Sequence, residues 1–306
     1  YLVGGSQPST GPLPSLKTTL ELPPKGTRRL KWAEAALAEP AASFKQARLS
    51  AARKWEAEVA RLEQLNAGLV EVRTGDPAWD HAFALSQTLA HSLLIGPTHS
   101  LPAPSFALTR QPDQGYSLRG DGQDYSHLWN GQTPLEAYYL CGLLLPASPD
   151  LASGLLQNFL ATQQENGEVD LKPGLGGQRS QLLATPLLAS LAWRIYETSE
   201  EMSLLEEVYP KLLQFVKAWL TPTQDRDLDG IPEWEHLFQI GFDDHPLFSH
   251  FHPWAQGLDP ATVESPDLCA FLYRECALLQ KMAKLLRRKE ELRFLQGVAR
   301  RLKNAV

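Results

Sequence analysis

Apolar side chains recur at helical spacing along most of the chain that follows Asp76. Side chains three and four positions apart share one face of a helix, so this pattern predicts amphipathic helices. The predicted helices cover residues 78–95, 133–145, 149–164, 180–198, 200–220, 265–286 and 289–305. Proline stands directly after Asp76 and Ser148, and proline is favoured in the first turn of a helix. Short links join some neighbouring segments, which predicts antiparallel helical hairpins in an all-α domain over residues 76–306.

The first 75 residues follow a different pattern. Residues 1–40 are rich in proline, glycine, serine and threonine, and only the segment 17–22 resembles a strand, which Pro23 and Pro24 end. One strand cannot be stable alone, so either it pairs with another part of the protein or the region is the tail of a β domain. We interpret residues 1–40 as the tail of an N-terminal β domain. Residues 41–75 are rich in alanine, lysine, arginine and glutamate around an apolar stripe, which predicts a linker helix.

Three long links separate the predicted hairpins, over residues 96–132, 165–179 and 221–264. Links longer than about 12–15 residues are usually functional or disordered. These links hold most of the histidines and many aromatic residues, which disfavours disorder. Because each long link lies between hairpins, we expect them to form one functional face on an α/α scaffold.

The composition excludes several classes of protein. The 306-residue chain is 43% hydrophobic and 21% charged, as in ordinary globular proteins. Its net charge of −6 argues against nucleic acid as a partner, because phosphate binding depends on clustered lysine and arginine. No apolar run reaches the ~18 residues that suggest a membrane span. The three cysteines fit no disulfide or zinc pattern, so we expect reduced thiols and a cytoplasmic location.

The segment from Asp225 to Pro246 holds seven carboxylates in 22 residues. Its first half repeats the spacing of a calcium loop, with acids at positions one, three, five and nine, namely Asp225, Asp227, Asp229 and Glu233. Position twelve is His236 rather than glutamate, so this is not an EF-hand and would need a further ligand from elsewhere. Acids this close repel one another unless a cation or several donors neutralise them. The two interpretations are a Ca²⁺ site and a solvated acidic turn.

Asp243 and Asp244 lie in the second half of the same segment. A carboxyl group held beside aromatic rings has a raised pKa and can act as a general acid. The alternative is a capping turn before His245 and Pro246. On these residues alone, the capping turn is the simpler interpretation.

The link before residue 132 combines planar donors, acids and aromatic rings. Proteins bind sugars in this way: an aromatic ring stacks on the apolar face of the sugar, while acids, amides and arginine bridge its hydroxyl groups. The candidate sugar-binding residues, including three from the acidic segment, are Arg110, Tyr116, Asp124, Tyr125, Trp129, Asn130, Gln132, Trp234, His236 and Asp244. The alternative is a well-packed loop with aromatic anchors.

Short motifs follow one another in a set order through the helical region. They are Leu101-Pro-Ala-Pro104, Arg110, Gly115-Tyr-Ser117, Arg119-Gly-Asp-Gly122, Asp124-Tyr125, Leu128-Trp-Asn-Gly131, Asn158-Phe159, Gln163, Gly167, Ala184-Thr-Pro-Leu-Leu-Ala189, residues 225–236 and Gly241-Phe-Asp243. The series resembles the six-hairpin (α/α)6-toroid inverting glycosidases, which include processing α-glucosidase I, mannosylglycerate hydrolase and amylo-α-1,6-glucosidase-like (debranching-type) proteins. The resemblance covers about residues 76–286, and residues 1–66 resemble the exit from the β-sandwich and linker helix of such enzymes.

The resemblance implies hydrolysis of an oligosaccharide or other glycoside. The general-acid motif of the family matches residues 236–246. The match implies that Asp243 is the general acid and that Asp244 stands where the family motif has asparagine. Some relatives carry calcium near the toroid, which favours Ca²⁺ at the acidic loop. The base in the family is a glutamate on a late loop, and no matching segment lies between Asp243 and Val306. We therefore expect the base outside this chain, in an incomplete toroid.

The sequence thus predicts a glycoside hydrolase that cleaves α-glucosidic or α-mannosidic bonds with inversion. One alternative is a non-catalytic carbohydrate-binding or calcium-stabilised scaffold on the same fold. A further alternative is a lyase or isomerase on an α/α toroid, which would use histidine or tyrosine rather than paired carboxylates.

Overall fold

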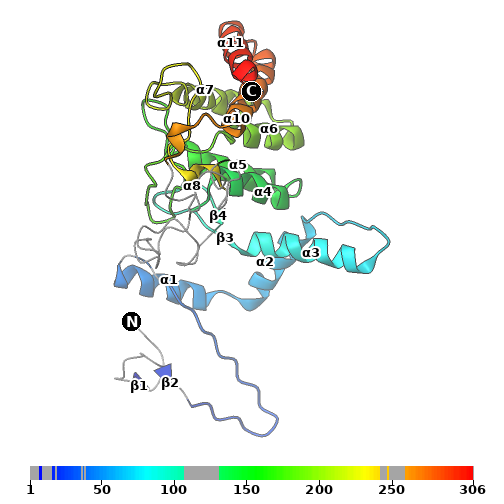
Figure 1. Ribbon diagram of the computed structural model, residues 1–306. Coiled ribbons are helices and arrows are strands. Elements are labelled where there is room, and N and C mark those ends of the chain that lie inside the picture. Colours follow the sequence, from blue (N-terminus) through cyan, green and yellow to red (C-terminus); the bar gives the residue numbers. More distant parts are fainter. Residues whose placement is uncertain are drawn as a thin grey trace. The chain divides into compact units, whose positions relative to one another are not determined.

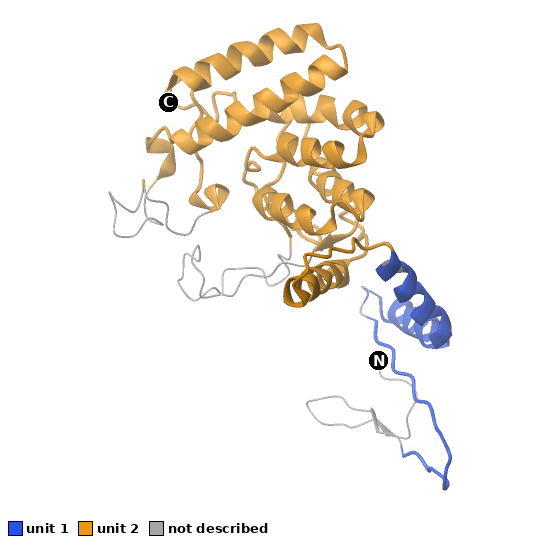
Figure 2. Ribbon diagram, turned by 90° about the vertical axis from the view of Figure 1, so that its right-hand side faces the viewer, with its two compact units in different colours: residues 1–67 blue, residues 68–306 orange. Residues whose placement is uncertain are grey.

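The structure is a computed structural model of the whole chain, and it describes residues 7–8, 16–17, 19–35, 37, 39–106, 131–241, 247 and 259–305. The chain divides into two compact units, residues 1–67 and residues 68–306 (Figure 2).

The first unit contains two short strands and two helices. β1 (Gln7–Pro8) pairs antiparallel with β2 (Leu16–Lys17). Helices α1 (Pro40–Ala52) and α2 (Trp55–Ala67) follow, and no residue of α1 is buried. The described part of this unit therefore has little hydrophobic core to hold it together.

Two predictions for the first unit are wrong in detail. Residues 19–22 form no strand, and Leu20 and Leu22 are exposed. The predicted linker helix is two helices, because the backbone turns to an extended conformation at Arg53 (φ −59°, ψ 142°). The Arg53 carbonyl oxygen accepts a hydrogen bond from Lys31 Nζ at 2.7 Å instead of continuing the helical ladder.

The second unit is built almost entirely from helices. They are α3 (Pro77–Ser92), α4 (Pro134–Leu144), α5 (Pro149–Leu160), α6 (Leu188–Ser199), α7 (Met202–Ala218), α8 (Leu237–Ile240), α10 (Pro266–Leu285) and α11 (Lys289–Ala305), with the 3-10 turn η2 (Pro260–Thr262). The strands in its described part are β3 (Leu94–Ile95) and β4 (Ser105–Phe106), which pair antiparallel. The predicted all-α character is thus confirmed for the described residues.

Successive helices form hairpins that stack beside one another (Figure 1). Short links join α4 to α5, α6 to α7 and α10 to α11. Helix α6 packs against α5 and α7, and α10 packs against α6, α7 and α11. Their apolar faces form one core, in which the largest fully buried side chains are Trp219 and Trp234.

Local signals set most of the helix starts. Pro77, Pro134, Pro149 and Pro266 each occupy the first turn of a helix, where the missing N–H is not needed. Helix α4 also has a capping box, in which Thr133 accepts from the Glu136 N–H and Glu136 accepts from the Thr133 N–H. These features confirm the two starts predicted after Asp76 and Ser148.

The predicted start of the helix over residues 180–198 is wrong. Helix α6 begins only at Leu188, because Leu183 pairs with Asp170 in an isolated antiparallel bridge. Pro186 also disfavours a helical conformation at Thr185. The predicted end of α3 is also wrong, by three residues. The sequence predicts a helix to residue 95, whereas α3 ends at Ser92 because the chain then enters β3.

The three cysteines are free and buried in the helical core. Burial raises the pKa of the Cys141 and Cys269 thiols to about 11, and that of Cys276 to about 12. They are therefore core side chains rather than nucleophiles. No helix in the described part of the chain has both the length and the apolar character needed to cross a membrane.

Candidate functional site

Long connections between the hairpins meet at one end of the second unit. Helices α5 and α7 end there, and α6 and α10 begin there (Figure 1). The connection 161–187 and the described parts of the connection 219–265 therefore share that end. Residues of both connections line a hollow of about 460 Å³. This is the arrangement expected from links that all fall between hairpins.

Several of the ordered sequence motifs are hydrogen-bonded to one another. The Asn158 side chain accepts from the Ala103 N–H at 3.0 Å and donates to the carbonyl oxygens of Ala103 and Pro104. Gln163 Nε2 donates to the carbonyl oxygen of Lys211 at 2.8 Å. These motif residues thus join the connections to the helices behind them.

Gln239 fixes the short helix α8 to the connection before α6. Its side chain is fully buried, and its Oε1 accepts from the N–H groups of Glu235 and His236, each at 2.9 Å. Its Nε2 donates to the Leu183 carbonyl oxygen at 2.9 Å. The Gln239 carbonyl oxygen in turn accepts from the Thr185 hydroxyl at 2.6 Å. The structure thus joins two motifs that lie more than 50 residues apart.

Helix α8 ends at Ile240, three positions before the expected general acid. Its C-terminal cap, Gly241, has φ +79°, and a Cβ at this position would lie 2.7 Å from Leu135 Cδ2. Glycine is favoured at this left-handed position, because a residue with a Cβ would be strained there. Asp243 and Asp244 themselves lie outside the described residues. So do six candidate sugar-binding residues, namely Arg110, Tyr116, Asp124, Tyr125, Trp129 and Asn130.

His236 caps the start of α8. Its Nδ1 accepts from the Phe238 N–H at 3.0 Å, so the neutral ring carries its proton on Nε2. Burial lowers the pKa of the imidazole. The neutral form that the cap requires is therefore also the favoured form.

Trp234 lies in the core rather than at a sugar pocket. Its side chain is 0% exposed. The ring packs edge-on against Trp219 and Phe271, with centroids 5.6 and 6.4 Å apart, and its Nε1 donates to Asp267 Oδ1 at 3.2 Å. This position leaves no face of the ring for a sugar.

Gln132 is also buried, at 4% exposure. Its Nε2 donates to Ser105 Oγ at 2.7 Å, which ties the start of α4 to β4. Its Oε1 is buried and has no hydrogen-bond partner. Gln132 therefore holds the start of α4 against β4, and its predicted contact with a sugar stays a prediction.

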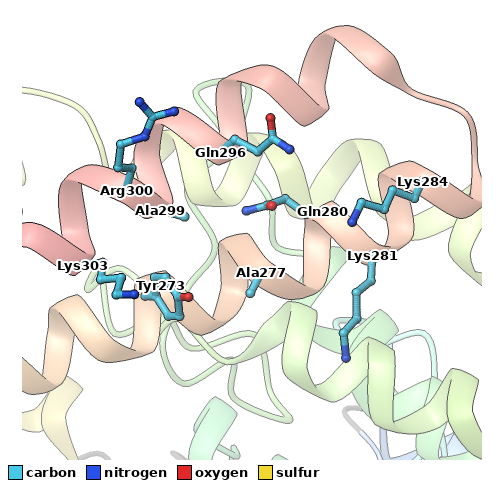
Figure 3. Close-up of a pocket in the computed structure, with 9 residues that line it drawn as sticks. All are labelled: Tyr273, Ala277, Gln280, Lys281, Lys284, Gln296, Ala299, Arg300 and Lys303. Atoms are coloured by element: carbon cyan, nitrogen blue, oxygen red, sulfur yellow. The ribbon is translucent and has the colours of Figure 1, made fainter.

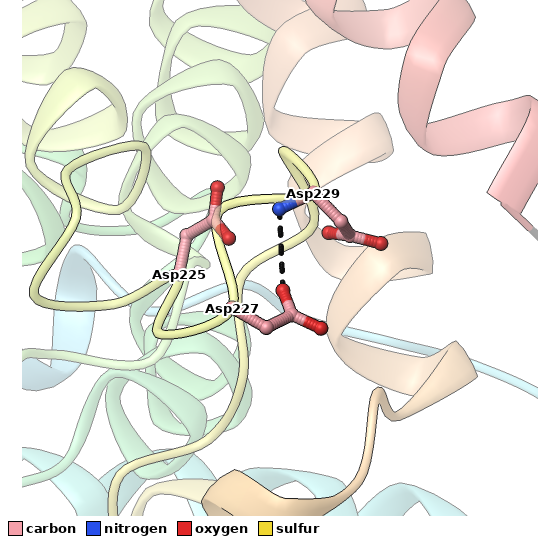
Figure 4. A group of neighbouring side chains, drawn as sticks. All are labelled: Asp225, Asp227 and Asp229. Carbon is pink, nitrogen blue, oxygen red and sulfur yellow. Dashed lines mark hydrogen bonds between the residues drawn. The ribbon is translucent and has the colours of Figure 1, made fainter.

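The acidic loop after α7 brings three carboxylates together (Figure 4). One oxygen from each of Asp225, Asp227 and Asp229 lies within 4.8 Å of the others. Asp225 is nine-tenths buried; its Oδ2 accepts from the Gly230 N–H at 2.9 Å, whereas its Oδ1 has no partner. A buried carboxylate oxygen without a partner is costly, and a bound cation would remove that cost.

Two glutamates flank the three aspartates. Glu233 is buried, but its Oε2 accepts from the Arg226 N–H at 3.1 Å, and it is not one of the three clustered carboxylates. Burial raises the pKa of Glu264, and so do the charge of Asp229 and its hydrogen bond to Glu264. Glu264 precedes α10, so it is a ligand candidate that the loop sequence could not reveal. The oxygen-rich set fits a hard divalent cation.

A buried carboxylate organises the start of α6. Glu275 on α10 accepts from the N–H groups of Ala189 and Ser190, at 2.6 and 2.8 Å, and from Ser190 Oγ at 2.7 Å. Helix α6 has no side-chain cap of its own. Burial raises the Glu275 pKa, whereas these donors act to lower it. Glu275 therefore caps α6 from a neighbouring hairpin, where a negative charge suits the helix N-terminus.

A second hollow, of about 420 Å³, lies between α10 and α11 (Figure 3). Its charged lining residues are Lys281, Lys284, Arg300 and Lys303. All four are exposed, and Lys281 Nζ lies 5.1 Å from the centre of the Trp193 ring. This hollow is separate from the long connections and agrees with a solvated helix surface.

Comparison with models of protein families gives a match over much of the chain. The family model described as the mannosylglycerate hydrolase MGH1-like glycoside hydrolase domain matches residues 125–306, which is more than half of the chain. No protein of curated function matches the sequence. The match covers the hairpins from α4 to α11 together with the acidic loop and α8. The chain therefore belongs to the MGH1-like glycoside hydrolase family, within the six-hairpin glycosidases.

Proposed function

We propose that this protein is a glycosidase that cleaves α-glucosidic or α-mannosidic bonds with inversion of configuration. The observation that carries the proposal is the family match over residues 125–306, because a glycoside hydrolase domain acts on carbohydrate. The stacked hairpins with long connections at one end agree with part of an (α/α)6 toroid. In that fold, the long connections would surround the substrate.

In the proposed reaction, two carboxyl groups act on opposite sides of the sugar ring. Asp243 protonates the leaving glycosidic oxygen as its bond to the anomeric carbon breaks. A second carboxyl group, the base, takes a proton from water, whose oxygen bonds to the same carbon from the other face. Room for that water requires the two carboxyl groups to be about 6.5–9.5 Å apart.

The contacts of α8 support a role for the segment that follows it. The buried Gln239 and the Thr185 hydroxyl hold α8 against the connection before α6. Gly241 then turns the chain immediately before Phe242 and Asp243. A general acid must be held in a defined position to act, and this anchor supplies a rigid start for its segment.

Sugar release tests the proposal. The full-length protein would be assayed against a panel of α-glucosides and α-mannosides, beside Asp243→Asn and the control Glu207→Gln, which removes one exposed charge on α7. We expect the parent and the control to release one class of sugar and Asp243→Asn to lose this activity while still folding. Release that survives in Asp243→Asn would refute the acid assignment. Sugar binding without any release would favour the non-catalytic scaffold.

The acidic loop is proposed to bind Ca²⁺ in support of this site. The buried, unpartnered Asp225 Oδ1 supports the proposal, together with the nearby Asp227, Asp229 and Glu264. Such a cation would join the loop after α7 to the segment before α10, on either side of the expected acid. Its contribution would be structural, since Asp243 and the base carry the chemistry.

Removal of calcium tests this part of the proposal. Saturation at about 100 times the Kd would stabilise the fold by about 2.7 kcal/mol, which is about 5–10 °C in Tm for a domain of this size. We expect Ca²⁺ to raise the Tm of the chelator-treated protein and of Glu207→Gln, but not that of Asp225→Asn. Equal shifts in all three proteins, or no shift in the parent, would show that the loop is a solvated acidic turn.

A further inference from the structure

We propose that the hollow between the connections 161–187 and 219–236 is a binding subsite for a neutral sugar unit. Its volume of about 460 Å³ lies within the range of ligand pockets. One wall comes from the turn after α5, and the other from the stretch between the end of α7 and α8. The choice of a sugar as the ligand rests on the proposed function, whereas the hollow and its chemistry do not.

The lining carries unused hydrogen-bonding groups. Among the described residues, the side chains of Gln164, Gln181 and Thr223 make no hydrogen bond, and each is exposed to the hollow's solvent. Amides and hydroxyls of this kind both donate and accept, as sugar hydroxyls do. The walls therefore offer complementary partners to a polyol without first breaking internal bonds.

Four charged side chains also line the hollow. Glu168 and Glu235 approach each other closely enough for the charge of one to act on the other, and Arg179 lies at the same hollow. A carboxylate accepts from two neighbouring hydroxyl groups, and the planar guanidinium donates to two. Asp170 is not free for this role, because its oxygens accept from the Lys172 and Gln181 N–H groups.

The backbone at Gln181 is held in an uncommon conformation. Its φ is +60°, in the left-handed region that a residue with a Cβ seldom occupies. The Asp170 carboxylate fixes this conformation through the Gln181 N–H at 2.9 Å. Strain of this kind persists where the surroundings enforce it, and it collects at binding sites. Here the strained backbone places the side-chain amide of Gln181, which makes no hydrogen bond, on the wall of the hollow.

One buried amide also lacks a full set of partners. Gln224 is 5% exposed, and its buried Oε1 has no hydrogen-bond partner. The wall behind Glu235 is therefore polar rather than apolar. No aromatic side chain lines the hollow within the described residues. The site thus lacks a stacking surface, so we expect weak binding that depends on hydrogen bonds, with a Kd of about 1 mM.

Two variants each delete one polar side chain from the lining of the hollow without disturbing the fold. Gln181→Gly deletes the side chain at a φ that glycine adopts freely, and Gln164→Ala deletes an exposed amide with no hydrogen bond. The matched control is Gln296→Ala, which removes an exposed amide from the separate hollow between α10 and α11.

Calorimetry would measure the binding of maltotetraose and of an α-linked mannotriose to the full-length Asp243→Asn protein, at fixed Ca²⁺. We expect at least a tenfold loss of affinity for one of the two sugars in Gln181→Gly and in Gln164→Ala, with no change in Gln296→Ala. Equal affinity in all variants, or no binding by the parent, would overturn the subsite.

Turnover separates this inference from the proposed function. In the catalytically intact chain, the two wall variants should raise KM and leave kcat unchanged. If sugar is released with an unaltered KM, the subsite is refuted and the glycosidase stands. If the intact chain binds sugar but releases none, and the two wall variants weaken that binding, the subsite stands and the glycosidase is refuted.

Discussion

The hydrogen bonds of Gln239 give the sharpest test of how this site is built. Gln239→Leu keeps nearly the same volume and removes the amide, so it deletes hydrogen bonds without opening a large cavity. The amide serves three backbone groups in a fully buried position. In the variant, the Leu183 carbonyl oxygen and the N–H groups of Glu235 and His236 lose that partner.

The expected loss follows from those three bonds. A typical hydrogen bond contributes about 0.5–1.5 kcal/mol net, and a buried group left without a partner costs about 1–3 kcal/mol. We therefore expect Gln239→Leu to lower the free energy of unfolding by about 3 kcal/mol. For a unit of this size, that corresponds to about 6–12 °C in Tm. The matched control is Gln163→Ala, whose amide is less buried and donates to two carbonyl oxygens.

Urea unfolding followed by circular dichroism measures the difference, with the transition midpoint and slope both fitted. Sugar release at a temperature where both variants remain folded then measures the effect on the site. We expect Gln239→Leu to lose more activity than Gln163→Ala, because α8 leads directly to Asp243. A loss of less than about 1 kcal/mol would refute the reasoning that the buried amide anchors α8.

Three further predictions concern other buried polar groups. Glu275→Gln places an amide N–H₂ group against the donors at the start of α6, so thermal unfolding should show a loss of about 2–4 kcal/mol, and an unchanged Tm would contradict the cap. Tyr209→Phe removes a buried hydroxyl that has no partner, so the same assay should show a gain of about 1 kcal/mol; a loss would show that the hydroxyl is bonded. Burial lowers the pKa of His236. The stability that the neutral imidazole contributes is therefore complete above the pKa of the unfolded state, and it is lost as pH falls through the lower pKa of the folded state. Below about pH 6.5, the protein should therefore lose stability faster than His236→Asn, which keeps a capping acceptor without titrating; parallel pH curves would contradict this.

Local sequence signals were sufficient for most of the helices. A 3.6-residue repeat and a proline in the first turn depend only on neighbouring residues, so α3, α5 and α10 begin within one residue of their predicted starts. The order of the short motifs also predicted the glycosidase family, which the family match confirms. These properties can be predicted from the sequence because each depends on residues that lie only a few positions apart.

Contacts between distant residues decided the rest. The late start of α6 follows from the pairing of Leu183 with Asp170, and its cap comes from Glu275, 86 residues beyond Ala189. The periodic pattern could not show these partners, since it records only which residues share a helix face. It also could not separate a tryptophan that faces a sugar from one, such as Trp234, that fills the core.

The acidic loop also depends partly on local sequence and partly on contacts between distant residues. The spacing of Asp225, Asp227 and Asp229 is local, so the sequence by itself determined that three carboxylates would gather in one turn. The tertiary structure alone decided that one oxygen of Asp225 is buried without a partner, and that Glu264 approaches from another segment. Burial and long-range proximity depend on how the hairpins pack, and packing is a property of the whole fold rather than of any one segment.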